Sequence, residues 1–166
     1  RLSIETATDI DSDIYLAFVL DRDSERIMCI ASSSGGMDIE EIAKTNPDSI
    51  IRVPIEPAVG LRDFQAREIA FALGLEVSHI SEAVIALHAC YRAFRDLDAT
   101  MVEINPLVVT KDGRLLALDA KMGFDDNALF RRQQVSELRD KSQEDPREMN
   151  AADRGISYVG LDGNIG

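Results

Sequence analysis

Two stretches of the sequence, Met101 to Thr110 and Arg114 to Ala120, form a predicted β-hairpin whose polar residues could bind a metal ion. If Lys111–Gly113 is a three-residue loop with its glycine in the left-handed conformation, Asn105 lies directly opposite Asp119. An amide oxygen and a carboxylate opposed in this way suit Mg²⁺, which usually takes one or two protein oxygens and completes its shell with water and phosphate oxygens. The spacing therefore indicates a magnesium site and, through it, a nucleotide.

Side-chain alternation along these strands predicts two faces of different character. One face is apolar throughout and carries Val102, Ile104, Val108, Leu116 and Leu118. The other face is polar at one end, with Glu103, Asn105, Asp119 and Lys121, and apolar near the turn, with Leu107, Val109, Leu115 and Ala117. Pro106 interrupts the first strand, so we expect an edge position or a bulge there.

The same residues allow a plainer interpretation. Polar residues are ordinary at strand ends, and a two-residue Asp112-Gly113 turn would place Asn105 and Asp119 on opposite faces. The loop Ser32–Gly36 could contact phosphate through its backbone N–H groups, although loops of this composition are usually connections. The sequence contains no G-x-S-x-G, H-E-x-x-H, G-x-x-x-x-G-K-[ST] or G-x-G-x-x-G motif. No motif therefore indicates a serine hydrolase, a zinc protease, a P-loop enzyme or a dinucleotide-binding site.

The elements that must position the hairpin are predicted from apolar periodicity and from turn and cap residues. We expect a first hairpin, a short helix, a strand and two longer helices. In chain order they are Ile14 to Leu20 with Arg26 to Ala31, Asp38 to Lys44, Ile50 to Val53, Leu61 to Leu73 closed by Gly74, and Ser78, as a cap, to about Leu97.

Composition limits the classes of partner. The 166 residues are 45% hydrophobic, which suffices for one ordinary domain. The formal net charge of −12 opposes binding to nucleic acid or to an anionic membrane surface. The longest apolar run, Ile14 to Leu20, is far shorter than the roughly 20 residues that span a bilayer. Cys29 and Cys90 stand in separate apolar contexts, so we expect reduced, buried thiols.

Several motifs along the chain resemble the β subunit of succinyl-CoA synthetase, and the resemblance covers essentially all 166 residues. The motifs that carry it are Glu103-Ile104-Asn105-Pro106-Leu107, Leu118-Asp119-Ala120-Lys121, Asn127 to Arg131, Ser142 to Glu148, Leu161 to Gly166, Glu5 to Ile10, Gly35 to Glu40, and Arg67 to Leu75. A related family, the malate–CoA ligase β subunit, is resembled as well, at Glu56 to Leu61, Phe64 to Glu68 and Asp119 to Met122.

The resemblance implies an α+β fold, the second half of an ATP-grasp domain, with a mainly antiparallel sheet and flanking helices. It divides the chain into an ATP-grasp portion at 1–140, a connector at 141–155, and the first strand of a CoA-ligase domain at 156–166. We therefore expect the chain to be a piece of a longer protein and inactive alone.

The resemblance also implies a function. Members join succinate to CoA with ATP or GTP, reversibly, through a phosphohistidine on an α subunit, with CoA and the dicarboxylate bound mainly outside this region. Asn105 and Asp119 match the Mg²⁺ ligands, and Glu103 matches the glutamate that contacts the phosphohistidine. The nucleotide contacts match Glu5, Thr8 and Asp13.

Two departures and three alternatives accompany this hypothesis. Asp13 stands where the family usually has Glu, and Ser34 stands where Glu commonly precedes the two glycines. The alternatives are a malate–CoA ligase, a non-catalytic subunit-interaction module, and another ATP-grasp ligase without CoA chemistry. The family also implies a cytoplasmic location, or the mitochondrial matrix in a eukaryote, with no membrane partner.

Overall fold

The computed structural model describes residues 7–138, 145–152, 154–156, 158 and 160. The chain divides into two compact units, with the boundary between Ala128 and Leu129. Each unit is treated separately below. None of the described helices is long and apolar enough to cross a membrane.

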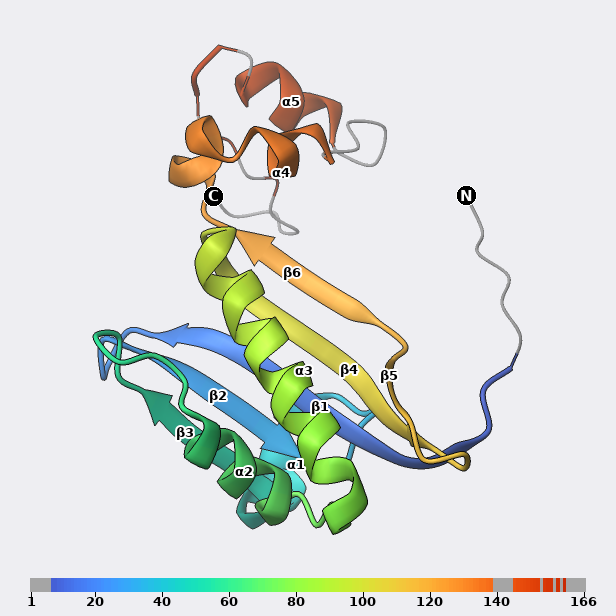
Figure 1. Ribbon diagram of the computed structural model, residues 1–166. Coiled ribbons are helices and arrows are strands. Elements are labelled where there is room, and N and C mark those ends of the chain that lie inside the picture. Colours follow the sequence, from blue (N-terminus) through green and yellow to red (C-terminus); the bar gives the residue numbers. More distant parts are fainter. Residues whose placement is uncertain (1–6, 139–144, 153, 157, 159, 161–166) are drawn as a thin grey trace. The chain divides into compact units, whose positions relative to one another are not determined.

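The first unit is built on an antiparallel sheet of six strands (Figure 1). The strand order is β3-β2-β1-β4-β5, and β6 also pairs with β4. With its flanking helices, this arrangement confirms the predicted α+β class. The strands are β1 (Ile10–Asp21), β2 (Arg26–Ser32), β3 (Ile50–Ile55), β4 (Ala99–Thr110), β5 (Leu115–Ala117) and β6 (Ala120–Phe124).

Helices lie on both faces of this sheet. Figure 1 shows α2 (Asp63–Ala72) and α3 (Val77–Asp96) over one face and the short α1 (Ile39–Thr45) on the other. The main apolar core lies on the α2–α3 side, where alternate residues of β1 pack beneath the helices. Its most deeply buried large side chains include Ile14, Leu16, Phe18, Ile55 and Ile69.

The predicted hairpin and helices of the first unit are present. Every residue from Ile14 to Phe18 is buried, as expected for a strand covered on both faces. Asp38 caps α1 by accepting a hydrogen bond from the Glu40 backbone N–H at 3.1 Å. The prediction of Ser78 as a helix cap was wrong. Glu76, with extended backbone, is the N-cap of α3, and the helix begins at Val77, so Ser78 already lies in its first turn.

The second hairpin has the predicted register but not the predicted faces. Val109 pairs with Leu115 and Glu103 with Lys121, as a three-residue loop requires. From Ile14 to Leu16, β1 advances two residues while its partner β4 advances three, from Ile104 to Leu107, so β4 carries a bulge at Pro106. The alternative expectation for Pro106, a position on an edge strand, does not apply.

The extra residue reverses the side-chain alternation beyond the bulge. Val102, Ile104, Leu107 and Val109 therefore all belong to the core under α2 and α3. The predicted apolar face was wrong, because Leu116 and Leu118 are exposed and Val108 lies outside this cluster.

The second unit contains short helices. A 3₁₀ turn at Asp126–Arg131 leads into it, followed by α4 (Gln133–Glu137) and α5 (Pro146–Ala152). The Asp145 carboxylate accepts hydrogen bonds from the backbone and guanidinium of Arg147, which hold the Asp145 pKa at about 2. Most of the strand predicted from Ile156 lies outside the described residues.

Candidate functional site

A polar pocket of about 490 Å³ lies on the α1 face of the sheet. Strands β1, β4 and β6, the loop before α1 and the first turn of α1 all contribute to it. The polar side chains that line this pocket are Tyr15, Asp38, Glu40, Glu103, Asn105 and Lys121. It is the place where the structure gathers acidic, amide and basic groups from segments far apart in the sequence.

Glu103 is held near the centre of this pocket by its strand and by a phenol. In the sheet it lies between Ala17 on β1 and Lys121 on β6. The Tyr15 hydroxyl donates a hydrogen bond to Glu103 Oε2 at 2.9 Å. Tyr15 is 3% exposed, and burial together with the Glu103 carboxylate raises the pKa of its hydroxyl. The phenol therefore stays protonated and remains a donor to Glu103.

The Asn105 side chain joins β4 to the loop that precedes α1. The Gly36 backbone N–H donates to Asn105 Oδ1 at 2.7 Å, and Asn105 Nδ2 donates to the Met37 carbonyl oxygen at 3.0 Å. Both amide atoms are used, so the orientation of the side chain is fixed.

The same loop is also fixed to β1. The Gly35 N–H donates to the Asp13 carbonyl oxygen at 3.1 Å, and a Cβ at Gly35 would lie 2.6 Å from the Ile14 nitrogen. Only glycine fits where the loop touches the strand this closely.

Asp119 lies opposite Asn105, as the hairpin register predicts. The Asn105 backbone N–H donates to the Asp119 carbonyl oxygen at 3.3 Å. The Asp119 side chain is exposed, and its Oδ1 accepts a hydrogen bond from the Ala120 N–H at 2.9 Å. The sheet thus brings the backbones of the two predicted metal ligands together.

The donor set of Asn105 and Asp119 fits Mg²⁺ chemically. Asn105 Oδ1 keeps a second lone pair beside its bond to Gly36, and the Asp119 carboxylate offers further acceptor sites. Within the described part of the chain, no group of three His, Cys, Asp or Glu side chains could hold a metal ion. These residues therefore suit a cation that takes few protein ligands and completes its shell with water and phosphate oxygens.

The nucleotide contacts suggested by resemblance do not all join this pocket. Thr8 lines a separate recess beside Thr110 and Lys111. Thr110 lies five positions beyond Asn105 on β4, about 16 Å along an extended strand. Asp13 pairs with Val108, and its carbonyl oxygen rather than its carboxylate contacts the loop. Glu5 lies outside the described residues.

Sequence reasoning missed Tyr15 and offered Gly35 and Gly36 only as part of a loop that could contact phosphate or simply connect two elements. Tyr15 carries the only polar side-chain group in the apolar run from Ile14 to Leu20, which was the available signal for it. The two glycines were noted as part of a small-residue loop, and the structure places their N–H groups against β1 and Asn105.

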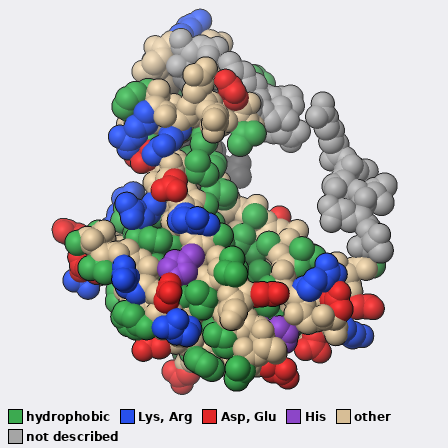
Figure 2. Space-filling model, in the orientation of Figure 1, with side chains coloured by type: hydrophobic (Ala, Val, Ile, Leu, Met, Phe, Trp, Pro, Cys, Tyr) green, Lys and Arg blue, Asp and Glu red, His purple; other side chains and the backbone are tan. Residues whose placement is uncertain are grey.

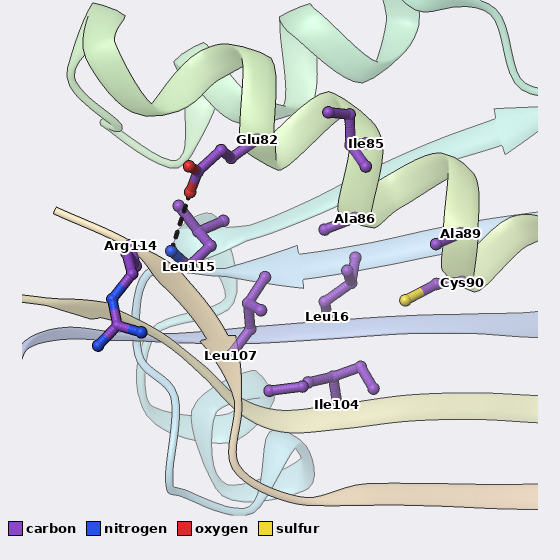
Figure 3. Close-up of a pocket in the computed structure, with 11 residues that line it drawn as sticks. Leu16, Glu82, Ile85, Ala86, Ala89, Cys90, Ile104, Leu107, Arg114 and Leu115 are labelled. Carbon is purple, nitrogen blue, oxygen red and sulfur yellow. Dashed lines mark hydrogen bonds between the residues drawn. The ribbon is translucent and has the colours of Figure 1, made fainter. Parts of the chain in front are cut away.

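A second hollow, an apolar groove of about 440 Å³, lies between α3 and the β4–β5 hairpin (Figure 3). Ile85, Ala86 and Ala89 of α3 face Leu107 and Leu115 across it. At its end, Glu82 Oε2 accepts a hydrogen bond from the Leu115 N–H at 3.0 Å, which ties the helix to the hairpin. The lining offers few polar groups, so its chemistry differs from that of the polar pocket.

The surface around the helices carries mixed charge. Figure 2 views the α2–α3 side, where acidic and basic side chains are interspersed with hydrophobic ones. Exposed apolar side chains on these helices include Phe64, Phe71, Val77 and Ile85. The helices therefore present exposed apolar side chains among charged ones on this face.

Curated relatives match the whole chain. It is 62% identical over 166 residues to the probable malate–CoA ligase subunit β of Mesorhizobium japonicum. It is 49% identical over 166 residues to the ADP-forming succinate–CoA ligase subunit β of Nitratiruptor sp.. The chain spans 42% and 43% of the lengths of these two relatives.

Solved structures share the fold at low sequence identity. ATP citrate lyase from Methanothrix soehngenii, in complex with citrate and coenzyme A, superposes with a TM-score of 0.67 at 19% identity. The match covers 90% of this chain and 34% of that one. A dinucleotide-forming acetyl-coenzyme A synthetase from Ca. Korarchaeum cryptofilum gives 0.51 at 14% identity, over 72% of this chain and 55% of that one.

The family comparison agrees with the architecture. The ATP-grasp domain family matches residues 1–109, which include β1 to β3, α1 to α3 and most of β4. The polar pocket lies mainly within this matched region, with Lys121 of β6 beyond it. The chain therefore belongs to the ATP-grasp domain family, and its curated relatives are succinate–CoA and malate–CoA ligase β subunits.

Proposed function

We propose that this chain is the nucleotide- and magnesium-binding part of the β subunit of a dicarboxylate–CoA ligase. The observation that carries the proposal is that Asn105 and Asp119 oppose each other across the hairpin. Asn105 lies on β4, the strand that also carries Glu103. In the complete enzyme, a dicarboxylate, CoA and ATP or GTP give an acyl-CoA reversibly. The phosphoryl group is carried by a histidine of an α subunit.

Each residue of the site has a distinct task in this proposal. Asn105 and Asp119 hold Mg²⁺, which offsets negative charge on the phosphate oxygens during phosphoryl transfer when it is bound. Glu103 accepts a hydrogen bond from the imidazole of the partner's histidine and so orients it. Glu5, Thr8 and Asp13 contact the nucleotide.

The net charge of the chain makes the metal more important. A formal charge of −12 repels a nucleoside triphosphate, which is itself strongly anionic. Mg²⁺, together with basic groups from other parts of the complete enzyme, offsets this repulsion. The same charge argues against nucleic acid and anionic membranes as partners, in keeping with a cytoplasmic enzyme.

Malate–CoA ligation is a second candidate for the reaction. It is favoured by the 62% identity to a probable malate–CoA ligase subunit, against 49% for a succinate–CoA ligase subunit over the same 166 residues. Measuring kcat/KM of the complete enzyme with malate and succinate side by side decides between them. A ratio above about 10 in either direction identifies the preferred acid.

The test of the metal site is Asp119→Ala in the complete enzyme with its α subunit. Loss of a charged ligand should slow ATP-dependent phosphorylation of the α-subunit histidine by about 100-fold or more at limiting Mg²⁺. The rate of phosphorylation is followed with labelled ATP over a range of Mg²⁺ concentrations.

Asp23→Ala is the matched control, because Asp23 is an exposed aspartate in the turn of the other hairpin. It should leave the rate unchanged. Near-normal phosphorylation by Asp119→Ala at limiting Mg²⁺ would contradict the metal assignment and favour a non-catalytic interaction module. ATP-dependent ligation by the complete enzyme without any need for CoA would favour another kind of ATP-grasp ligase.

A further inference from the structure

Tyr15 is placed to control one of the two carboxylate oxygens of Glu103. The two residues are 88 positions apart in the sequence, yet the Tyr15 hydroxyl donates to Glu103 Oε2 at 2.9 Å. Tyr15 stands on β1 with its ring buried between the sheet and the α1 side of the domain. Because the Tyr15 side chain is almost fully buried, its hydroxyl is held beside Glu103.

The surroundings of Glu103 make this hydrogen bond more than a packing contact. Asp38 and Glu40, at the start of α1, line the same pocket as Glu103 and carry the same charge. They repel its carboxylate, whereas Lys121 on the neighbouring strand attracts it without fixing its direction, and the phenol donates a hydrogen bond to one of its two oxygens. A glutamate has three rotatable side-chain bonds, and each unrestrained bond lets the carboxylate leave the position in which it can meet a partner.

We propose that Tyr15 is a positioning residue, whose hydroxyl fixes Glu103 Oε2 and leaves Oε1 directed to the histidine of the partner subunit. This inference rests on the proposed function, because it assigns Glu103 the contact with that histidine. Tyr15 itself does not touch the reacting atoms. It acts by reducing the number of conformations that Glu103 can adopt before the imidazole arrives.

Tyr15→Phe in the complete enzyme tests the inference, because it removes the hydroxyl and keeps the buried ring. Single-turnover phosphorylation of the α-subunit histidine should slow by about 10-fold, the size expected for one lost hydrogen bond to a charged group. The KM for ATP and the thermal midpoint should stay within about twofold and about 2 °C of the wild-type values.

Tyr91→Phe is the matched control. Tyr91 is also buried, on the α2–α3 side of the sheet, but its hydroxyl has no hydrogen-bond partner among the described residues. Removing that hydroxyl should leave the phosphorylation rate unchanged. A general effect of losing a buried phenol would instead slow both variants.

The double variant Tyr15→Phe/Glu103→Gln separates positioning from structure. If Tyr15 acts through Glu103, its substitution should have no further effect once Glu103→Gln has slowed the reaction. An equal loss in both backgrounds would overturn the inference, as would a wild-type rate in Tyr15→Phe alone.

Failure of the proposed function looks different. It would appear as no histidine phosphorylation by the wild-type enzyme, or as full activity of Glu103→Gln, and either result would also overturn the inference. Slow phosphorylation in Glu103→Gln together with a wild-type rate in Tyr15→Phe would overturn the inference alone.

Discussion

The two faces of the sheet in the first unit are held by different kinds of interaction. Under α2 and α3, apolar side chains such as Phe18 and Ile69 are fully buried and pack against one another. On the α1 face, Glu103 and Asn105 are held by hydrogen bonds of 2.7 to 3.0 Å to Tyr15, Gly36 and Met37. Strands β1 and β4 contribute residues to both faces.

The difference shows how one sheet separates stability from chemistry. Apolar burial is non-directional and grows with area, so it stabilises the fold without selecting one orientation of a polar group. Hydrogen bonds contribute less net free energy each but fix direction and distance. A substitution on the helix-covered face should therefore affect stability most, and one on the α1 face should affect geometry most.

The largest expected effect comes from Phe18→Ala. Phe18 is fully buried on β1, with its ring centroid 5.8 Å from that of Tyr91. Loss of this ring should lower the free energy of unfolding of the domain by about 3–5 kcal/mol. Hydrogen exchange of β1 amides in the complete protein would measure it.

Leu20→Ala is the control on the same strand, because Leu20 is 53% exposed. Its cost should be below about 1 kcal/mol. If the two substitutions destabilised the domain equally, the helix-covered face would not be the main source of stability.

An intermediate effect is expected from Gly35→Ala in the loop before α1. The new Cβ would lie 2.6 Å from the Ile14 nitrogen, so the loop or β1 must shift. The free energy of unfolding of the domain should fall by about 1–3 kcal/mol. The Gly36 amide, which is hydrogen-bonded to Asn105 in the unsubstituted protein, should exchange faster with solvent. NMR of the amide signals would report both changes.

Gly36→Ala provides the comparison at the neighbouring position. No atom lies within 4 Å of its added Cβ, so only the positive φ of 69° opposes the substitution. That cost is about 1 kcal/mol. A larger loss for Gly36→Ala than for Gly35→Ala would show that loop conformation, rather than the contact with β1, is what matters here.

The smallest effect is expected from His88→Gln on the outer surface of the helices. His88 Nε2 lies 2.9 Å from Asp63 Oδ1, and the aspartate side chain is 71% exposed. An exposed pair of this kind contributes at most about 1 kcal/mol. Chemical denaturation should detect little change, and a loss above about 2 kcal/mol would mean that this contact couples α2 to α3 more strongly than exposed pairs do.

The local parts of the fold and site were predictable from the sequence, and the long-range contacts were not. The loop Lys111–Gly113 sets the hairpin register, so the opposition of Asn105 and Asp119 follows from local turn chemistry. The short helix predicted from Asp38 to Lys44 also follows from local chemistry, although Asp38 is its cap and α1 begins at Ile39. Tyr15 and Glu103 are brought together by the pairing of β1 with β4, which no short-range pattern encodes.

The prediction of the two faces of β4 failed for a different reason. Pro106 correctly indicated an irregularity, but a proline does not reveal whether the strand gains a residue or ends at a sheet edge. Once a residue is gained, every side chain beyond it changes face. The prediction that assumed strict alternation therefore held from Val102 to Asn105 and failed from Leu107 onward.

The bulge at Pro106 makes the length of this strand more important than the identity of its residues. Deleting the extra residue would restore strict alternation with Leu107 and Val109 still under the helices. One further residue inserted before Leu107 would instead turn Leu107 and Val109 toward the α1 side and send Val108 under the helices, while leaving Glu103 in place. An insertion in this segment should therefore disturb the core more than a conservative substitution of one of its residues. The number of residues between Asn105 and the hairpin turn therefore determines which side chains of β4 face the helices.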